Sequence, residues 1–255
     1  MLVVQAYGAA RRQVLLQKIK YPYVSQRNMQ AIRKKERREV KMQIIEPSVR
    51  IMGKYSEREM CQNIERAGRT CYQSLDKATN DSCFDFVRML IKREHESVLE
   101  HESITVEFVC DRGVSHELIR HRLASYSQES TRFCAYKDGL IFIRPCFFAE
   151  DSIEYKSWYD IMARIEKLYK TMLKNGVGPQ QARSILPNSL KTTIVMTANI
   201  REWRYILGLR CSRAAHPQMR QVMFMLLELF NKDFPTLFGD VYNNIYYQTG
   251  GKING

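Results

Sequence analysis

Histidine side chains gather in one part of this chain, next to arginines and hydroxyl groups. The histidines of one 27-residue window are His95, His101, His116 and His121, and His216 stands apart. Arginines flank one of them in the triplet Arg120-His121-Arg122. Successive helical residues point about 100° apart, so this triplet would surround a helix end with two guanidiniums and an imidazole. Such a group is suited to binding phosphates or an anionic ring from several sides.

A polar loop is expected directly after the triplet. Its hydrogen-bonding side chains are Ser125, Tyr126, Ser127, Gln128, Ser130, Thr131 and Arg132. This density of donors is unusual and favours a binding site. A solvated helix end followed by a surface loop has the same composition, however, because charge clusters are common on protein surfaces. The residue types alone therefore leave both interpretations open.

The spacing of these residues resembles that of a known family. The triplet Arg120–Arg122, seven further residues and Ser130 reproduce the RHR-x7-S motif of flavin-dependent thymidylate synthases. Further blocks that follow the family's order are His95-Glu96-Ser97 with Glu100-His101, Gly176-Val177 to Arg183 and Pro187, Asn199–Arg201, Leu209-Arg210 and His216–Gln218. The resemblance covers residues 42–255, and ordered blocks at matching spacing are far more specific than one tripeptide.

The resemblance implies an enzyme that methylates dUMP to dTMP. Methylenetetrahydrofolate would donate the one-carbon unit, and FAD reduced by NADPH would carry the hydride. The substrate-binding residues it implies are Glu117, Arg120, Gln128, Glu129, Ser130, Thr131, Arg132, Arg183 and Arg210. Among them, Arg132 resembles the residue at the substrate phosphate. Arg210 resembles the arginine that favours the uracil ring ionised at nitrogen 3, so it is the expected catalytic residue.

The resemblance also implies where the cofactor binds. The expected FAD-binding residues are His95, Ser97, Arg120, His121, Arg122, Gln128, Asn199, Ile200, Arg201, Tyr205 and His216. His95 resembles a residue beside both flavin and folate. The chain departs from the family by extra residues between Arg210 and His216, which changes the expected pose of His216. A homotetramer with FAD sites shared between subunits is implied, and no metal.

The reaction explains why an arginine is needed. Methylation at carbon 5 requires electron density there, and a fixed guanidinium stabilises the developing ring charge without changing its own protonation. Hydride chemistry belongs to the flavin, so the protein orients the reactants and supplies electrostatics. Ser130 is expected to bind substrate and not to act as a nucleophile, since no histidine base is visibly paired with it.

Each of these residues also has a purely structural explanation. Arg183 could end a short helix before Pro187. Asn199 could serve as a helix cap alone, and Arg210 could form a surface ion pair. His95 could be a hydrogen-bonded polar residue beside a strand. It is the joint order of the residues that favours the functional interpretation.

Two other classes of function were weighed. A zinc hydrolase could use His95, Glu96, Glu100 and His101, but HExxH spacing is absent and the histidines do not align on one helix face. A nucleic-acid-binding protein is suggested by the net charge of +13. Most of that charge lies in residues 1–41, which hold eleven Lys or Arg and two Glu. A polyanion-binding domain would carry it on the folded body, so no nucleic-acid partner is expected.

Composition limits the cellular context. The seven cysteines are dispersed without a CxxC pair, as expected of reduced thiols in a cytoplasmic protein. No apolar run reaches the roughly 18 residues of a membrane-spanning helix, and no secretory signal is recognisable at the start. A cytoplasmic location without membrane association is therefore expected.

The pattern of apolar residues predicts a single α+β domain with a central, mostly antiparallel sheet flanked by long helices. The expected strands are 103–110, 140–144 and 192–198. The expected helices are one opened by the capping box Ser56 and Glu59 with Cys71 on its apolar stripe, 82–94, 113–124, one over 158–172 that ends at Asn175-Gly176, one capped by Asn199, and the last at 218–232.

Residues 1–41 are predicted to be an N-terminal extension outside the functional enzyme, with the synthase domain at 42–255. Arg37-Arg38 can be encoded by AGG-AGG, a ribosome-binding sequence, three codons before Met42. The segment could therefore be an upstream region read in frame by mistake. It could also be an organelle transit peptide, being Arg-rich and poor in acids, or a basic arm for an acidic partner.

Overall fold

A four-stranded antiparallel sheet is the centre of the computed structural model, which describes residues 42–136 and 138–248. The strand order is β2 (Ser48–Met52), β3 (Ser103–Asp111), β6 (Lys191–Asn199) and β4 (Ala124–Gln128). A separate parallel pair consists of β1 (Gln43–Ile45) and β5 (Ile141–Ile143). The predicted N-terminal extension lies outside the described residues.

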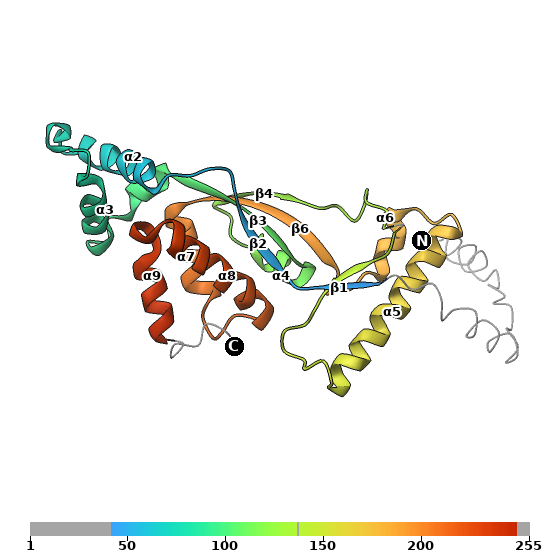
Figure 1. The fold of residues 1–255 in the computed structure, drawn as a ribbon. Coiled ribbons are helices and arrows are strands. Elements are labelled where there is room, and N and C mark those ends of the chain that lie inside the picture. The colour runs from blue at the N-terminus through green and yellow to red at the C-terminus, as the bar shows by residue number, and fades with distance from the viewer. Residues whose placement is uncertain (1–41, 137, 249–255) are drawn as a thin grey trace, which may run out of the picture. The chain divides into compact units, whose positions relative to one another are not determined.

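Helices account for most of the remaining described chain. They are α2 (Glu57–Thr70), α3 (Ser82–Lys92), α4 (Arg112–Leu118), α5 (Ile153–Lys174), α6 (Pro179–Ala182), α7 (Ile200–Arg210), α8 (Pro217–Asp233), α9 (Pro235–Gln248) and the short 3-10 helices η2 (Leu75–Lys77), η3 (Glu96–His101) and η4 (Arg183–Ile185). Figure 1 shows α7, α8 and α9 grouped beside the central sheet, and α5 with α6 beside β1. The predicted α+β class with an antiparallel sheet and long flanking helices is confirmed.

The main core lies between the sheet and helices α7 to α9. Strand β3 buries every second residue, as its alternating sequence predicts. Trp203 of α7 is fully buried against these strands and donates a hydrogen bond from Nε1 to the Ile104 carbonyl at 3.0 Å. Its ring packs on Phe108 of β3 and on Phe230 of α8. Trp203 therefore anchors α7, which carries several predicted site residues, to the sheet.

A smaller core joins α5 to the strand pair. Its buried apolar residues are Leu140, Phe142, Met162, Tyr169, Ala182 and Leu190. Glu166 is also buried here, and its carboxylate accepts a hydrogen bond from the Leu140 backbone N–H at 3.1 Å. Lys170, one helical turn later, lies 2.9 Å from the same carboxylate. The buried charge is thus paired, as a buried carboxylate requires.

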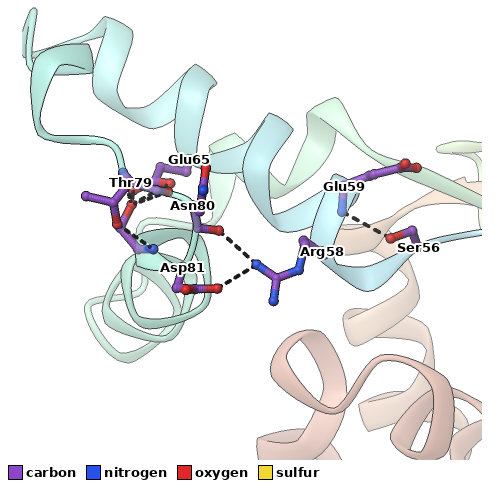
Figure 2. Close-up of polar contacts among 8 residues, drawn as sticks. Ser56, Arg58, Glu59, Glu65, Thr79, Asn80 and Asp81 are labelled. Atoms are coloured by element: carbon purple, nitrogen blue, oxygen red, sulfur yellow. Dashed lines mark hydrogen bonds and ion pairs between the residues drawn. The ribbon is translucent and has the colours of Figure 1, made fainter.

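Polar contacts fix the beginning of α2 (Figure 2). The Ser56 hydroxyl accepts a hydrogen bond from the Glu59 backbone N–H at 3.4 Å, so the predicted helix cap is confirmed. Arg58 donates to the Asp81 carboxylate at 2.7 Å and to the Asn80 carbonyl at 2.8 Å. These contacts tie the first turn of α2 to the loop that precedes α3.

Several predictions of local structure are wrong. The helix predicted over 113–124 ends at Leu118, and the predicted polar loop contains strand β4. Strand β4 was not predicted because its inward-facing residues include the polar residue Gln128. Strands β1 and β2 and helix α9 were not predicted at all. Cys71 is exposed at the end of α2 instead of lying on its apolar stripe.

The other predicted elements are confirmed within a few residues. They are strands β3, β5 and β6 and helices α2, α3, α5, α7 and α8. Asn199 caps α7 as predicted, and Pro217 occupies the first turn of α8. In the described part of the chain, no helix is both long enough and apolar enough to cross a membrane.

Candidate active site

The sheet register brings three predicted cofactor-binding segments to the same end of the sheet. Ser103, which follows η3, pairs with Asn199, the residue before α7. Ala124, which follows the Arg120–Arg122 triplet, pairs with Ala198 on the neighbouring strand. Segments far apart in the sequence therefore meet where β3 and β4 begin and β6 ends.

A pocket of about 580 Å³ lies at this end of the sheet. Its lining includes Asn199, Arg201 and Tyr205 from the predicted set, together with Leu123 and Arg204. The Asn199 side-chain oxygen accepts a hydrogen bond from the Glu202 N–H at 2.8 Å and so starts α7 at the pocket wall. A helix start with nearby arginines is a favourable place for an anionic group.

Acidic side chains balance the two arginines of this pocket. Arg201 lies 2.6 Å from Glu100, and Arg204 makes a bidentate pair with Asp240 at 2.7 Å. Burial opposes ionisation of Asp240, but the hydrogen bonds and charge of Arg204 outweigh it and hold the pKa of Asp240 below its ordinary value. These contacts fix Arg204, whose side chain is 9% exposed. The side chain of Arg201 is 50% exposed and can turn towards a ligand.

Arg210, the predicted catalytic residue, is held by two residues of a second cluster. Its Nε donates to Nε2 of His121 at 3.0 Å. Its Nη1 donates to the Glu117 carboxylate at 2.9 Å, and its Nη2 to the Glu117 carbonyl at 3.1 Å. With three of its five N–H groups engaged, the guanidinium has a fixed plane and still presents two donors.

His121 is uncharged in this cluster. Burial, together with the adjacent Arg210 charge, lowers the pKa of His121 to about 4. A guanidinium donates hydrogen bonds and accepts none, so the His121 Nε2 that receives the Arg210 N–H carries no proton. His121 thus acts as a neutral acceptor that orients the arginine.

The predicted substrate loop begins with two residues whose polar atoms are used inside the protein. Gln128 Nε2 donates to Ser115 at 2.8 Å and to Thr192 at 3.2 Å. The Glu129 carboxylate accepts from the Tyr136 hydroxyl at 2.9 Å and pairs with Lys191 at 2.8 Å. Both side chains therefore fix the loop to its surroundings.

The next residues of the loop include one arginine and contact a second. Arg183 Nη1 lies 3.5 Å from the hydroxyl of the buried Thr131, and Arg132 is exposed beside it in sequence with its guanidinium over the Phe133 ring. The Ser130 hydroxyl accepts a hydrogen bond from the Arg132 N–H at 3.3 Å. Ser130, Arg132 and Arg183 offer the hydroxyl and charges that a phosphate requires.

The predicted substrate loop and the pocket at the start of α7 lie at opposite ends of strand β4. Gln128 pairs with Ile194, whereas Ala124 pairs with Ala198. At a rise of about 3.4 Å per residue, the strand alone separates the two regions by roughly 14 Å. Within this chain, the predicted substrate residues and the predicted cofactor residues of α7 therefore form two separate groups.

The remaining predicted residues differ in their surroundings. The side chains of His95, Ser97, Arg120 and Arg122 are exposed near the pocket end of the sheet. Ile200 is fully buried, and its N–H donates to the Glu102 carbonyl at 2.9 Å. Position 200 turns the side chain into the core, and a role of Ile200 in cofactor binding stays a prediction.

His216 starts helix α8, where its Nδ1 accepts a hydrogen bond from the Gln218 N–H at 3.3 Å. The edge of its ring packs against Phe147, with centroids 5.6 Å apart. The structure thus shows a helix-capping histidine with an aromatic neighbour, and His216 is not among the residues that line the pocket at the start of α7.

Sequence reasoning missed Arg204 and Leu123 as lining residues of the pocket. Arg204 could have been identified from helical spacing, because it lies three residues after Arg201 on the same face of α7. In the described ranges, no three His, Cys, Asp or Glu side chains are grouped so that they could hold a metal ion. These ranges therefore offer no site for the zinc hydrolase that was considered as an alternative.

The pocket at the start of α7 thus combines two arginines and an exposed tyrosine with three glutamates, Glu96, Glu100 and Glu202, on an α+β scaffold. The family model described as thymidylate synthase complementing protein matches residues 54–236. The chain belongs to the family of flavin-dependent thymidylate synthases, as its sequence motifs predicted.

Individual relatives support the same assignment. The flavin-dependent thymidylate synthase of Mycobacteroides abscessus is 37% identical over 199 residues, which is 69% of this chain and 78% of that protein. The enzyme of the same name from Pyrococcus abyssi is 35% identical over 160 residues, 61% of this chain and 66% of that protein.

A solved structure shares the fold. The UMP/dUMP methylase PolB from Streptomyces cacaoi, bound with 5-Br dUMP, aligns with a TM-score of 0.65 and 21% identity. The alignment covers 81% of this chain and 97% of that chain. The shared α+β architecture thus extends over nearly the whole of that protein.

Proposed function

We propose that this chain catalyses the reductive methylation of dUMP to dTMP, the reaction of its family. Membership of that family makes it an enzyme, a flavin-dependent methyltransferase. The observation that carries the proposal within this structure is the fixed guanidinium of Arg210. The comparisons give no support to the alternative of a nucleic-acid-binding protein.

Arg210 would stabilise charge on the uracil ring. Loss of the proton on nitrogen 3 would place negative charge on the ring nitrogen and oxygens of dUMP, and carbon 5 would draw on this electron density when it attacks the one-carbon unit. The two N–H groups that Arg210 does not spend on Glu117 and His121 are available to an anionic ring. Because the guanidinium is already oriented, little reorganisation is required when the charge appears.

The pocket at the start of α7 fits the flavin nucleotide FAD. Arg201 would bind its diphosphate, while Arg204 stays paired with Asp240, and the exposed Tyr205 ring offers a face to an aromatic group. The Asn199 amide nitrogen remains a donor while its oxygen caps the helix. When bound, FAD supplies hydride chemistry, with NADPH as its reductant and methylenetetrahydrofolate as the one-carbon donor.

The substrate phosphate would bind at Ser130, Arg132 and Arg183, at the other end of β4. We propose that a homotetramer completes the site, with one subunit supplying the phosphate-binding loop and another the flavin pocket. The exposed side chains of Leu123 and Phe133, 72% and 78% accessible, support this arrangement. They flank the two regions and would be covered by a neighbouring copy.

The flavin assignment predicts that the purified protein is yellow and that heat or acid releases FAD from it. Arg201→Ala should weaken FAD binding about 10- to 100-fold, because it removes a charge-assisted hydrogen bond to the diphosphate. Absorbance and fluorescence titrations measure this. Arg88→Ala is the matched control, since Arg88 forms a similar exposed ion pair with Asp85. A protein that stays colourless in excess FAD would contradict the proposal.

We also propose that residues 42–255 contain the whole enzyme and that it works in the cytoplasm. The family match begins at residue 54, and all the proposed site residues lie after it. The seven cysteines are free, as expected in a reducing compartment. Expressed alone, residues 42–255 should equal the full chain in FAD content, tetramer formation and dTMP formation. Loss of any one of these on truncation would assign a role to residues 1–41.

A further inference from the structure

Glu202 is a buried carboxylate in the first turn of α7, between the flavin pocket and the Arg210 cluster. Its side chain is 11% exposed. A glutamate at the third position of a helix can bond back to the N-cap residue. Here its Oε1 lies 3.5 Å from Nδ1 of His121 instead. The carboxylate therefore faces the histidine that holds Arg210.

The hydrogen bond from Arg210 determines which His121 nitrogen is protonated. Nε2 accepts that bond and carries no proton. Since the ring is neutral, its proton is on Nδ1, the nitrogen that faces Glu202. The separation of 3.5 Å is longer than a strong hydrogen bond, so the attraction is mainly that of an electronegative side-chain oxygen for an N–H dipole.

The tautomer with its proton on Nε2 would make unfavourable contacts at both ring nitrogens. A proton on Nε2 would point at the Nε–H of Arg210, and two donors would face each other. The bare Nδ1 would then face the Glu202 carboxylate, so that two acceptors would meet. Glu202 and Arg210 therefore stabilise the same tautomer from opposite sides of the ring.

Neighbouring groups also restrict the ring. The Tyr126 hydroxyl donates to the His121 carbonyl at 2.6 Å and fixes the backbone from which the ring extends. The Tyr205 ring lies edge-on to the imidazole, with centroids 6.1 Å apart. Because the imidazole is buried as well, its tautomer is the main freedom left to it.

We propose that Glu202 is a positioning residue that holds His121 in its Nδ1–H tautomer and thereby orients the Arg210 guanidinium. The inference rests on the proposed function of Arg210. Glu202 acts through His121 and Arg210 and needs no contact with dUMP. Without its carboxylate, the Nε2–H tautomer becomes populated, the Arg210 Nε loses its acceptor, and the guanidinium is held through Glu117 alone.

Two substitutions separate this role from a general effect of charge. Glu202→Gln keeps a side-chain oxygen that can accept the Nδ1–H, whereas Glu202→Met has similar length and no strong acceptor. Glu154→Met is the control, because it also removes a carboxylate from the first turn of a helix, at an exposed position of α5. Thermal unfolding of each variant verifies that it folds.

The first readout is the tautomer itself. Solid-state NMR of protein with 15N-labelled histidine distinguishes Nδ1–H from Nε2–H rings, and the His121→Asn spectrum identifies the His121 signals among those of five histidines. We expect the Nδ1–H form in the natural protein, in Glu202→Gln and in the Glu154→Met control. Glu202→Met should show a substantial Nε2–H fraction.

The second readout is the kinetic split between kcat and KM. Glu202→Met should lower kcat about 10-fold with a smaller change in the KM for dUMP, because the arginine acts most strongly when the ring becomes charged. Glu202→Gln should stay within about 3-fold of the natural enzyme on the same scale. FAD content is measured in parallel because Glu202 also lines the flavin pocket.

A pure Nδ1–H signal in Glu202→Met would overturn the inference, as would a changed tautomer with unchanged kcat. An equal loss of kcat in Glu202→Gln and Glu202→Met would overturn it too, because charge and not the acceptor would then matter. If the natural protein formed no dTMP, the proposed function would fail. The NMR comparison would still support or overturn the effect of Glu202 on His121.

Discussion

Replacing Arg210 by alanine is expected to lower kcat for dTMP formation on the order of 100- to 1000-fold, the usual cost of removing one oriented electrostatic donor. The guanidinium is held by Glu117 and His121 before substrate arrives, so its loss removes a charge that no other group in the cluster replaces. Flavin content should stay unchanged, because Arg210 does not line the pocket at the start of α7. Steady-state kinetics and the visible spectrum measure both effects.

Two further variants test the specificity of this effect. Arg213→Ala removes an exposed arginine three residues later and should leave kcat unchanged. Ser130→Ala should raise the KM for dUMP and retain measurable turnover, because the Ser130 hydroxyl lies in the phosphate-binding loop, where it accepts the Arg132 N–H. An inactive Ser130→Ala enzyme that still binds dUMP would contradict a binding role. Full activity in Arg210→Ala would remove Arg210 from the mechanism.

The part of the fold with clear periodicity was predictable. Strand β3 alternates buried and exposed residues over its whole length, and Asn199 with Glu202 marks the start of α7. Strand β4 escaped prediction because it is an edge strand of mostly polar residues, in which Tyr126 and Gln128 face inward. Its position depends on pairing with β6, a contact that no local pattern reveals.

Helix α9 was not predicted for a different reason. It contains Gly239, Asn243 and Asn244, which have low helix propensity. Tertiary packing compensates for the low helix propensity of α9, because Leu237 and Phe238 are fully buried against the core. Tertiary contacts of this kind stabilise a helix whose sequence alone favours it weakly.

Motif order selected the residues of the candidate site, but the distances between them could not be predicted. It assigned Gln128 to Arg132 to the substrate and Asn199 to Tyr205 to the cofactor, and the register of β4 and β6 places these two groups at opposite ends of a strand. The inward orientation of Glu129 towards Lys191 and Tyr136 is equally invisible in the sequence. These positions depend on contacts between residues that are far apart in the sequence.

Trp203→Ala should lower the free energy of unfolding by about 3–5 kcal/mol, as is usual when a large buried aromatic side chain is removed. The indole is fully buried between β3 and α8, and its loss leaves a cavity and removes the hydrogen bond to the Ile104 carbonyl. Because Trp203 anchors α7, the substitution should also lower FAD content. Urea denaturation at a fixed protein concentration measures the stability change, since the proposed tetramer would make it concentration-dependent.

Two comparisons locate the origin of this effect. Trp203→Phe keeps most of the aromatic packing and should cost about 0.5–1.5 kcal/mol, the net contribution of one hydrogen bond. Tyr72→Ala removes an exposed ring and should change stability by less than about 0.5 kcal/mol. If Trp203→Ala cost no more than Tyr72→Ala, α7 would be held on the sheet by other contacts. Its two site residues, Arg201 and Arg210, would then owe their placement to the Asn199 cap and the Arg204–Asp240 pair.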